Sequence, residues 1–67
     1  MKHWIEVTGA WDDNKIMINL NNVSAVCDYS TAKNTETKTV IYCVGDTSAL
    51  HLKDTYDEIV TKIKNSI

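Results

Sequence analysis

The side chains best suited to metal chemistry are two histidines and two cysteines, namely His3, Cys27, Cys43 and His51. Together they form a Cys2His2 set, which in number is enough to hold a zinc ion. Structural zinc sites usually draw their ligands in close pairs, whereas these four residues are spread over most of the chain. The spacing favours two small core cysteines and two surface histidines, so we expect no metal and no other cofactor.

A disulfide is the second chemistry open to the cysteines. Cys27 and Cys43 lie on segments that are expected to pair as a hairpin, and a turn centred near Thr35 would place them directly opposite each other. Small secreted domains usually carry more cysteines, and thiols in a cytoplasmic protein stay reduced. We therefore expect two free thiols, with pairing as the open alternative.

Catalysis would need a nucleophile beside a base, or paired carboxylates. Asp12 and Asp13 form an acidic doublet, but they occupy a predicted turn, where aspartate is common for backbone reasons. Asp57 and Glu58 lie at a predicted helix start, where they complement the helix dipole. The chain has two glycines, far apart, which excludes a glycine-rich phosphate loop. We find no catalytic residues and expect that the protein is not an enzyme.

The elements that position these residues are predicted from hydrophobic periodicity. Apolar and polar residues alternate in segments 3–8, 15–20, 23–29 and 48–53, whereas segment 38–44 is rich in Thr, Val, Ile and Tyr and is apolar on both sides. These five segments predict antiparallel strands separated by turns. From residue 54 the spacing becomes that of one helical face, made of Tyr56, Ile59, Val60, Ile63 and Ile67. Thr55 and Glu58 match the capping-box spacing. The predicted fold class is α+β: an antiparallel five-stranded meander, strongly bent or a partial barrel, followed by one C-terminal amphipathic helix in a single domain, 1–67.

A chain of 67 residues is close to the lower size limit for folding alone. One helix covers one face of a five-stranded sheet, so the other face needs either a curled sheet or a second subunit. With so small a core we favour the second subunit and expect a homo-oligomer. The candidate interface residues are Trp4, Trp11, Met17, Val26 and Ile41.

The charge balance bears on partners. A formal net charge of −2 and the lack of arginine make nucleic-acid binding an unfavoured function, because it relies on a basic stripe. Lys33 and Lys38 flank a polar loop through which such contact would have to take place. No apolar run reaches the ~18–20 residues of a membrane span, and the first residues do not form a secretory signal. We expect a cytoplasmic protein with no membrane partner.

Two segments carry a resemblance to a known family. They are Ile16-Met-Ile-Asn-Leu-Asn-Asn-Val23 and Leu52-Lys-Asp-Thr-Tyr-Asp-Glu-Ile-Val60. Their pattern of strand, turn and helix entry resembles the short FlbD-like proteins encoded in flagellar operons. The resemblance covers most of the chain and implies a small strand-rich protein that ends in a helix. The family supplies no catalytic residues to transfer.

Taken together, these features favour a small non-enzymatic interaction or assembly protein that self-associates and has a protein partner. The alternative is a small regulatory protein that contacts nucleic acid through a loop. A basic patch formed in three dimensions would distinguish the two, because binding through such a patch weakens as salt rises.

Overall fold

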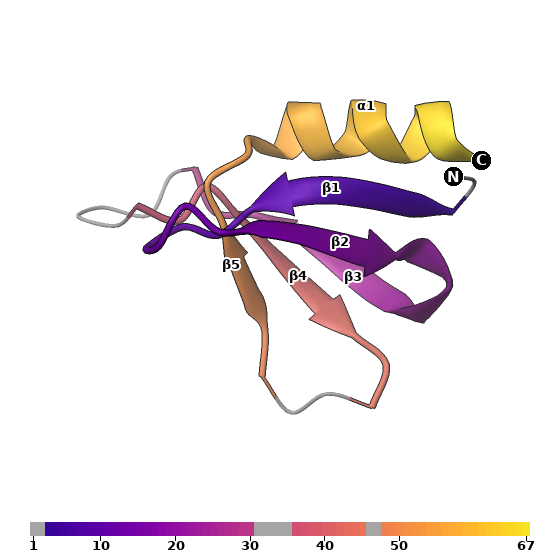
Figure 1. Ribbon diagram of the computed structural model, residues 1–67, viewed down its shortest axis with the longest axis horizontal. Helices are drawn as coiled ribbons and strands as arrows, with labels where there is room; N and C mark the ends of the chain where they lie inside the picture. Colours follow the sequence, from indigo (N-terminus) through magenta and orange to yellow (C-terminus); the bar gives the residue numbers. More distant parts are fainter. Residues whose placement is uncertain (1–2, 31–35, 46–47) are drawn as a thin grey trace.

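The computed structural model describes residues 3–30, 36–45 and 48–67. Two antiparallel sheets and one C-terminal helix make up the fold (Figure 1). The first sheet pairs β1 (Trp4–Thr8) with β2 (Lys15–Asn19), and the second has β3 (Val23–Asp28), β4 (Thr39–Cys43) and β5 (Leu50–Leu52) in that order. A 3₁₀ turn, η1 (Leu20–Asn22), leads from β2 to β3, and the helix α1 spans Tyr56–Ser66. No helix within the described ranges is long and apolar enough to cross a membrane.

The α+β class is confirmed, but the predicted five-stranded meander is wrong. The reason is η1, which turns the chain so that β2 and β3 fall into different sheets. Asn19 caps this corner, because its side-chain oxygen accepts the backbone N–H of Asn21 at 3.0 Å. The two sheets meet instead where an isolated bridge joins Gly9, just after β1, to Leu52 of β5.

The core lies between the two sheets and the helix. Ile5 and Val7 on β1 pair with Ile18 and Ile16 on β2, so their side chains share the inner face. The buried cluster consists of Ile5, Val7, Ile18, Ile41, Leu52 and Ile59. The chain therefore supplies from within itself the second layer that the sequence argument assigned to another subunit.

A β-bulge in β3 changes which side chains face inward. The register of β3 against β4 shifts between Val23 and Ala25, and a shift of one residue moves side chains to the opposite face. As a result Val26 packs against the core, and Ile41 is completely buried. The prediction that Val26 and Ile41 lie on an outer surface of the chain is therefore wrong.

The same register separates the two cysteines. Cys27 is the partner of Val40, and Cys43 is the partner of Val23, so the predicted opposition of the two thiols is wrong. Both are free thiols. The turn centre expected near Thr35 lies outside the described residues.

Helix α1 lies along the edge of β1 that β2 does not occupy (Figure 1). Lys62 Nζ donates a hydrogen bond to the carbonyl of Glu6 at 2.5 Å, and Ser66 Oγ donates to the carbonyl of Trp4 at 3.4 Å. An open strand edge exposes unpaired backbone groups, and covering it with a helix is one way to close it. The helix closes this edge while Ile59 fills the core beneath it.

Asp54 ties the helix entry to both sheets. One carboxylate oxygen accepts the backbone N–H of Thr8 at 2.7 Å, and the other lies 3.2 Å from Lys62 Nζ. Its backbone carbonyl accepts the buried hydroxyl of Thr39 at 2.7 Å. These contacts fix where α1 begins relative to β1 and β4.

The predicted capping box is confirmed. Thr55 Oγ1 accepts the N–H of Glu58, and Glu58 Oε1 accepts the N–H of Thr55. Hydrogen bonds from Thr55 to the carboxylate lower the pKa of Glu58 below its ordinary value. A carboxyl with a lowered folded-state pKa stabilises the fold above its ordinary pKa, and this contribution is lost as pH falls through the folded value. On the predicted apolar helix face Ile59 is buried and Ile63 packs on the core, whereas Ile67 is exposed.

The Asp54 contacts predict a stability difference between two acidic residues of the same segment. Asp54→Ala should lower the free energy of unfolding by about 2 kcal/mol, because the amide of Thr8 loses its partner. Asp57→Ala, at an exposed position in the first helical turn, should cost about 0.5 kcal/mol. Urea denaturation followed by circular dichroism measures both. Equal losses would contradict the role given to Asp54.

The helix packing predicts a second contrast. Ile59→Ala should cost about 2–4 kcal/mol because it opens a cavity in the core, whereas Ile67→Ala should change stability by less than about 0.5 kcal/mol. The same denaturation experiment applies. Comparable stability of the two variants would show that α1 does not pack as described.

The β3–β4 register predicts which thiols can cross-link. In a Cys27→Ser background, Val23→Cys should form a disulfide with Cys43 on mild oxidation, because the two positions are direct partners. The unmodified chain should keep two titratable thiols under the same oxidation, measured after unfolding without reductant. A disulfide between Cys27 and Cys43 would mean that the register is different.

Candidate functional site

The outer edge of β2 is an open strand edge beside the core. Among the described strands β2 pairs with β1 alone. At the turn that joins β1 to β2, the N–H of Gly9 donates a hydrogen bond to the carbonyl of Asn14 at 2.8 Å. In an antiparallel pair, residues whose backbone groups point toward the neighbouring strand alternate with residues whose backbone groups point away from it. This alternation directs the backbone N–H and C=O of Lys15 and Met17 away from β1. The edge can therefore accept another strand.

An apolar slot borders this edge. It lies between β2, η1 and the facing ends of β4 and β5, and its volume is about 230 Å³. Sites for small molecules usually enclose ~300–1,000 Å³, so the slot suits one or two apolar side chains better than a drug-sized ligand. It is lined by Ile16, Met17, Ile18, Asn19, Asn22, Cys43, Val44 and Leu50.

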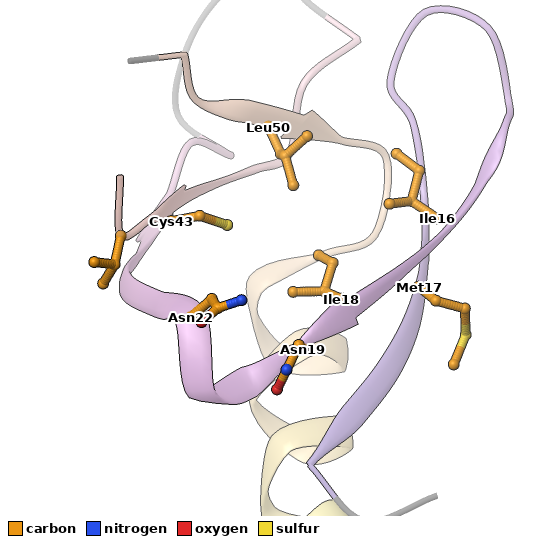
Figure 2. Close-up of a pocket in the computed structure, with 8 residues that line it drawn as sticks. Ile16, Met17, Ile18, Asn19, Asn22, Cys43 and Leu50 are labelled. Atoms are coloured by element: carbon orange, nitrogen blue, oxygen red, sulfur yellow. The ribbon is translucent and has the colours of Figure 1, made fainter. Parts of the chain in front are cut away.

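The side chains of the slot separate into a floor and a rim. In Figure 2, Ile16 and Ile18 point toward Leu50 and Cys43, whereas Met17 points away. Met17 is 49% exposed and Val44 is 68% exposed, so both sides of the slot carry an apolar residue at the surface. None of the lining residues is charged. The slot is thus suited to apolar side chains whose backbone hydrogen-bonds to β2.

Two of the predicted interface residues lie together on the outer face of the β1–β2 sheet. Trp4 is the cross-strand partner of Asn19, and Met17 is the partner of Glu6 two rows further on, in the next pair on the same face. Trp4 is 36% exposed, so it and Met17 form a diagonal apolar pair next to the open edge.

The other three predicted interface residues lie elsewhere. Ile41 belongs to the core, and the partly buried Val26 packs against it. Trp11 lies over β5, where its ring stacks on His51 with a centroid distance of 4.8 Å. The structure therefore brings together Trp4 and Met17 but not the full predicted set.

The metal-binding side chains identified in the sequence are dispersed in the described parts of the chain, which contain no group of three or more potential ligands. Cys43 lines the slot, whereas His51 stacks with Trp11. Cys27 lies in the row of Val40 and His51, on the other face of the same sheet from Cys43.

The carboxylates singled out in the sequence have structural partners. Asp12 accepts hydrogen bonds from the backbone and side chain of Asn14, and Asp13 forms an ion pair with Lys53. Of the two lysines proposed for a basic patch, Lys33 lies outside the described residues. Lys38 is exposed, and its carbonyl accepts the N–H of Tyr29 at 2.9 Å.

Met17 was among the predicted interface residues, but the slot beside it could not be predicted from the sequence. Cys43 and Leu50 face Ile16 and Ile18 only because η1 folds one sheet over the other. One signal was present in the sequence. Segment 15–19 has a single charged residue, Lys15. Edge strands that are protected from pairing with other chains usually carry more charged residues than this.

Comparison with protein-family models, curated proteins and solved structures found no match to this chain. The resemblance to the FlbD-like proteins therefore stays a prediction from the two quoted segments. The functional argument rests on the open edge of β2 and the slot beside it.

Proposed function

We propose that this protein is a small non-enzymatic interaction protein that forms a homodimer through β2. The observation that carries the proposal is the contrast between the two edges of the first sheet. The edge of β1 is covered by Asp54, Lys62 and Ser66, whereas the edge of β2 pairs with no other described strand. An exposed, largely apolar edge favours pairing with another chain.

The sequence of β2 is self-complementary in an antiparallel pair. With a two-fold axis at Met17, each Met17 faces its own copy, and the outward backbone groups of both strands are satisfied together. Lys15 then lies opposite Asn19 of the partner subunit, so no like charges oppose each other. On the outer face, the two Met17 side chains lie together at the axis, so they join the apolar pair of Trp4 and Met17 in one subunit to the same pair in the other.

The slot adds apolar contact to this pairing. On the inner face of the added strand, Ile16 and Ile18 of the partner subunit would lie at the slot mouth, near Leu50 and Val44. A specific interface needs about 600 Å² from each partner, which is roughly an eighth of the 4557 Å² surface of the chain. An interface of one strand and one slot is at the small end, so we expect a dissociation constant in the micromolar range.

Contact with nucleic acid is the second candidate, and one observation favours it. Tyr29 and Tyr42 are 42% and 46% exposed on the second sheet, with Lys38 beside Tyr29. Aromatic side chains on a sheet can stack on single-stranded bases. The net charge of −2 and the lack of arginine disfavour it, because they oppose phosphate binding.

The homodimer is tested by placing a charge at the two-fold axis. Met17→Lys sets two ammonium groups against each other and should convert a dimer of about 15 kDa into the 7.6 kDa chain. Thr61→Lys is the matched control, because it adds the same charge at an exposed helix position away from β2. Light scattering at several concentrations gives the mass, and circular dichroism confirms that each variant is folded.

Two results would contradict the homodimer. One is a natural chain that stays at 7.6 kDa up to several hundred micromolar. The other is a Met17→Lys variant that is folded and still dimeric. Binding of a single-stranded oligonucleotide that weakens as salt rises would favour the second candidate instead.

A further inference from the structure

A second exposed surface is built around Trp11, in the turn between β1 and β2. The indole is 70% exposed, although one side of it stacks on the imidazole of His51 at a centroid distance of 4.8 Å and an angle of 33°. Tyr29 meets the same imidazole edge-on at 6.4 Å. We call Trp11, His51 and Tyr29 the aromatic platform. Its outer surface is the part of the indole that His51 does not cover.

The aromatic platform is fixed to the sheet. Thr37, which is almost fully buried, places its hydroxyl 3.2 Å from Nδ1 of His51. Ala10, directly before Trp11, is buried and donates its N–H to the carbonyl of His51 at 3.0 Å. These contacts fix the imidazole of His51 and the backbone next to Trp11, which lowers the cost in side-chain entropy of presenting the platform to a ligand.

A carboxylate is fixed at the position that directly follows Trp11 in this turn. Both oxygens of Asp12 accept hydrogen bonds from Asn14, at 3.2 Å from the backbone and 2.8 Å from the side-chain amide. Gly9 leaves room for this arrangement, because a Cβ at that position would lie 2.6 Å from Asp12 Oδ1. Asp12 takes part in neither of the ion pairs formed within the described residues. Its negative charge is therefore available to a ligand.

The wider surroundings are also negative. Asp13 pairs with Lys53, and the charges of Asp13 and Glu36 both act on that ammonium group. Among the described residues around the platform, the carboxylates of Asp12, Asp13 and Glu36 outnumber the ammonium groups of Lys53 and of Lys38, which lies beside Tyr29. A cationic ligand would complement this charge, whereas the phosphates of a nucleic acid would be repelled.

We propose that the aromatic platform binds an arginine side chain presented by a partner protein. A guanidinium group stacks on aromatic rings and hydrogen-bonds to carboxylates, so it can use the exposed face of Trp11 and the charge of Asp12 together. The partner is a different protein, because this chain contains no arginine. The platform is also separate from the edge of β2, so this proposal does not depend on the homodimer.

The test uses the full chain and two fluorescein-labelled peptides. One peptide has three arginines separated by glycines, and the other has citrulline, an uncharged analogue, in place of each arginine. Fluorescence anisotropy should show saturable binding of the arginine peptide, at least tenfold tighter than binding of the citrulline peptide. Trp11→Leu, which keeps an apolar contact with His51 but has no aromatic face, should weaken binding about tenfold.

The role of the Asp12 carboxylate is tested by a matched pair of variants. Asp12→Asn preserves a side chain that can form the same turn, and it should weaken arginine-peptide binding about three- to fivefold. Asp57→Asn removes the same charge at an exposed helix position away from the platform and should leave binding unchanged. Light scattering should give the same mass for Trp11→Leu as for the natural chain, which keeps this result independent of the homodimer.

Four results would overturn the proposal. They are equal affinity for the two peptides, unchanged binding by Trp11→Leu, equal losses for Asp12→Asn and Asp57→Asn, and no saturable binding at millimolar peptide. Tighter binding of an oligothymidine strand than of the arginine peptide would assign the platform to nucleic acid instead.

Discussion

The carboxylate of Asp54 holds the amide of Thr8 and the ammonium group of Lys62, and the position of the helix depends on this contact. Because the contact fixes the start of α1 beside the end of β1, the rest of the helix runs along that strand and its side chains reach the strand carbonyls. Ile59 then enters the space between the two sheets. The position of α1 therefore both closes the edge of β1 and completes the core.

This placement makes the first sheet asymmetric. The helix satisfies one edge with side-chain hydrogen bonds, and the other edge has no such cover from the described residues. The single helix protects one edge of this sheet, so the other edge of the same sheet is open to association with another strand. The proposed arginine site uses a different property of the fold, the turn that places Trp11 over His51 of β5.

Local features could be predicted from the sequence, and contacts between distant residues could not. The helix was predicted because Thr55, Glu58 and its apolar spacing lie within one segment, and strand positions were predicted within a few residues for the same reason. The corner at η1 takes three residues and the bulge in β3 shifts the register by one, yet they separate the sheets and turn Val26 inward. The edge of β1 is covered through a contact between Glu6 and Lys62, which are 56 residues apart. No local sequence pattern indicates such a contact. Trp4 and Met17 were placed correctly on one outer face because alternation alone decides it.

Amide hydrogen exchange at several protein concentrations tests the contrast between the two edges most directly. The account predicts that the amide of Thr8, held by Asp54, is protected to the same extent at every concentration. The amides of Lys15 and Met17, on the open edge, should exchange fast in dilute solution and become protected as concentration rises. Strong protection of Met17 at the lowest concentration would contradict the account, because it would mean that the edge of β2 is already paired within a single chain.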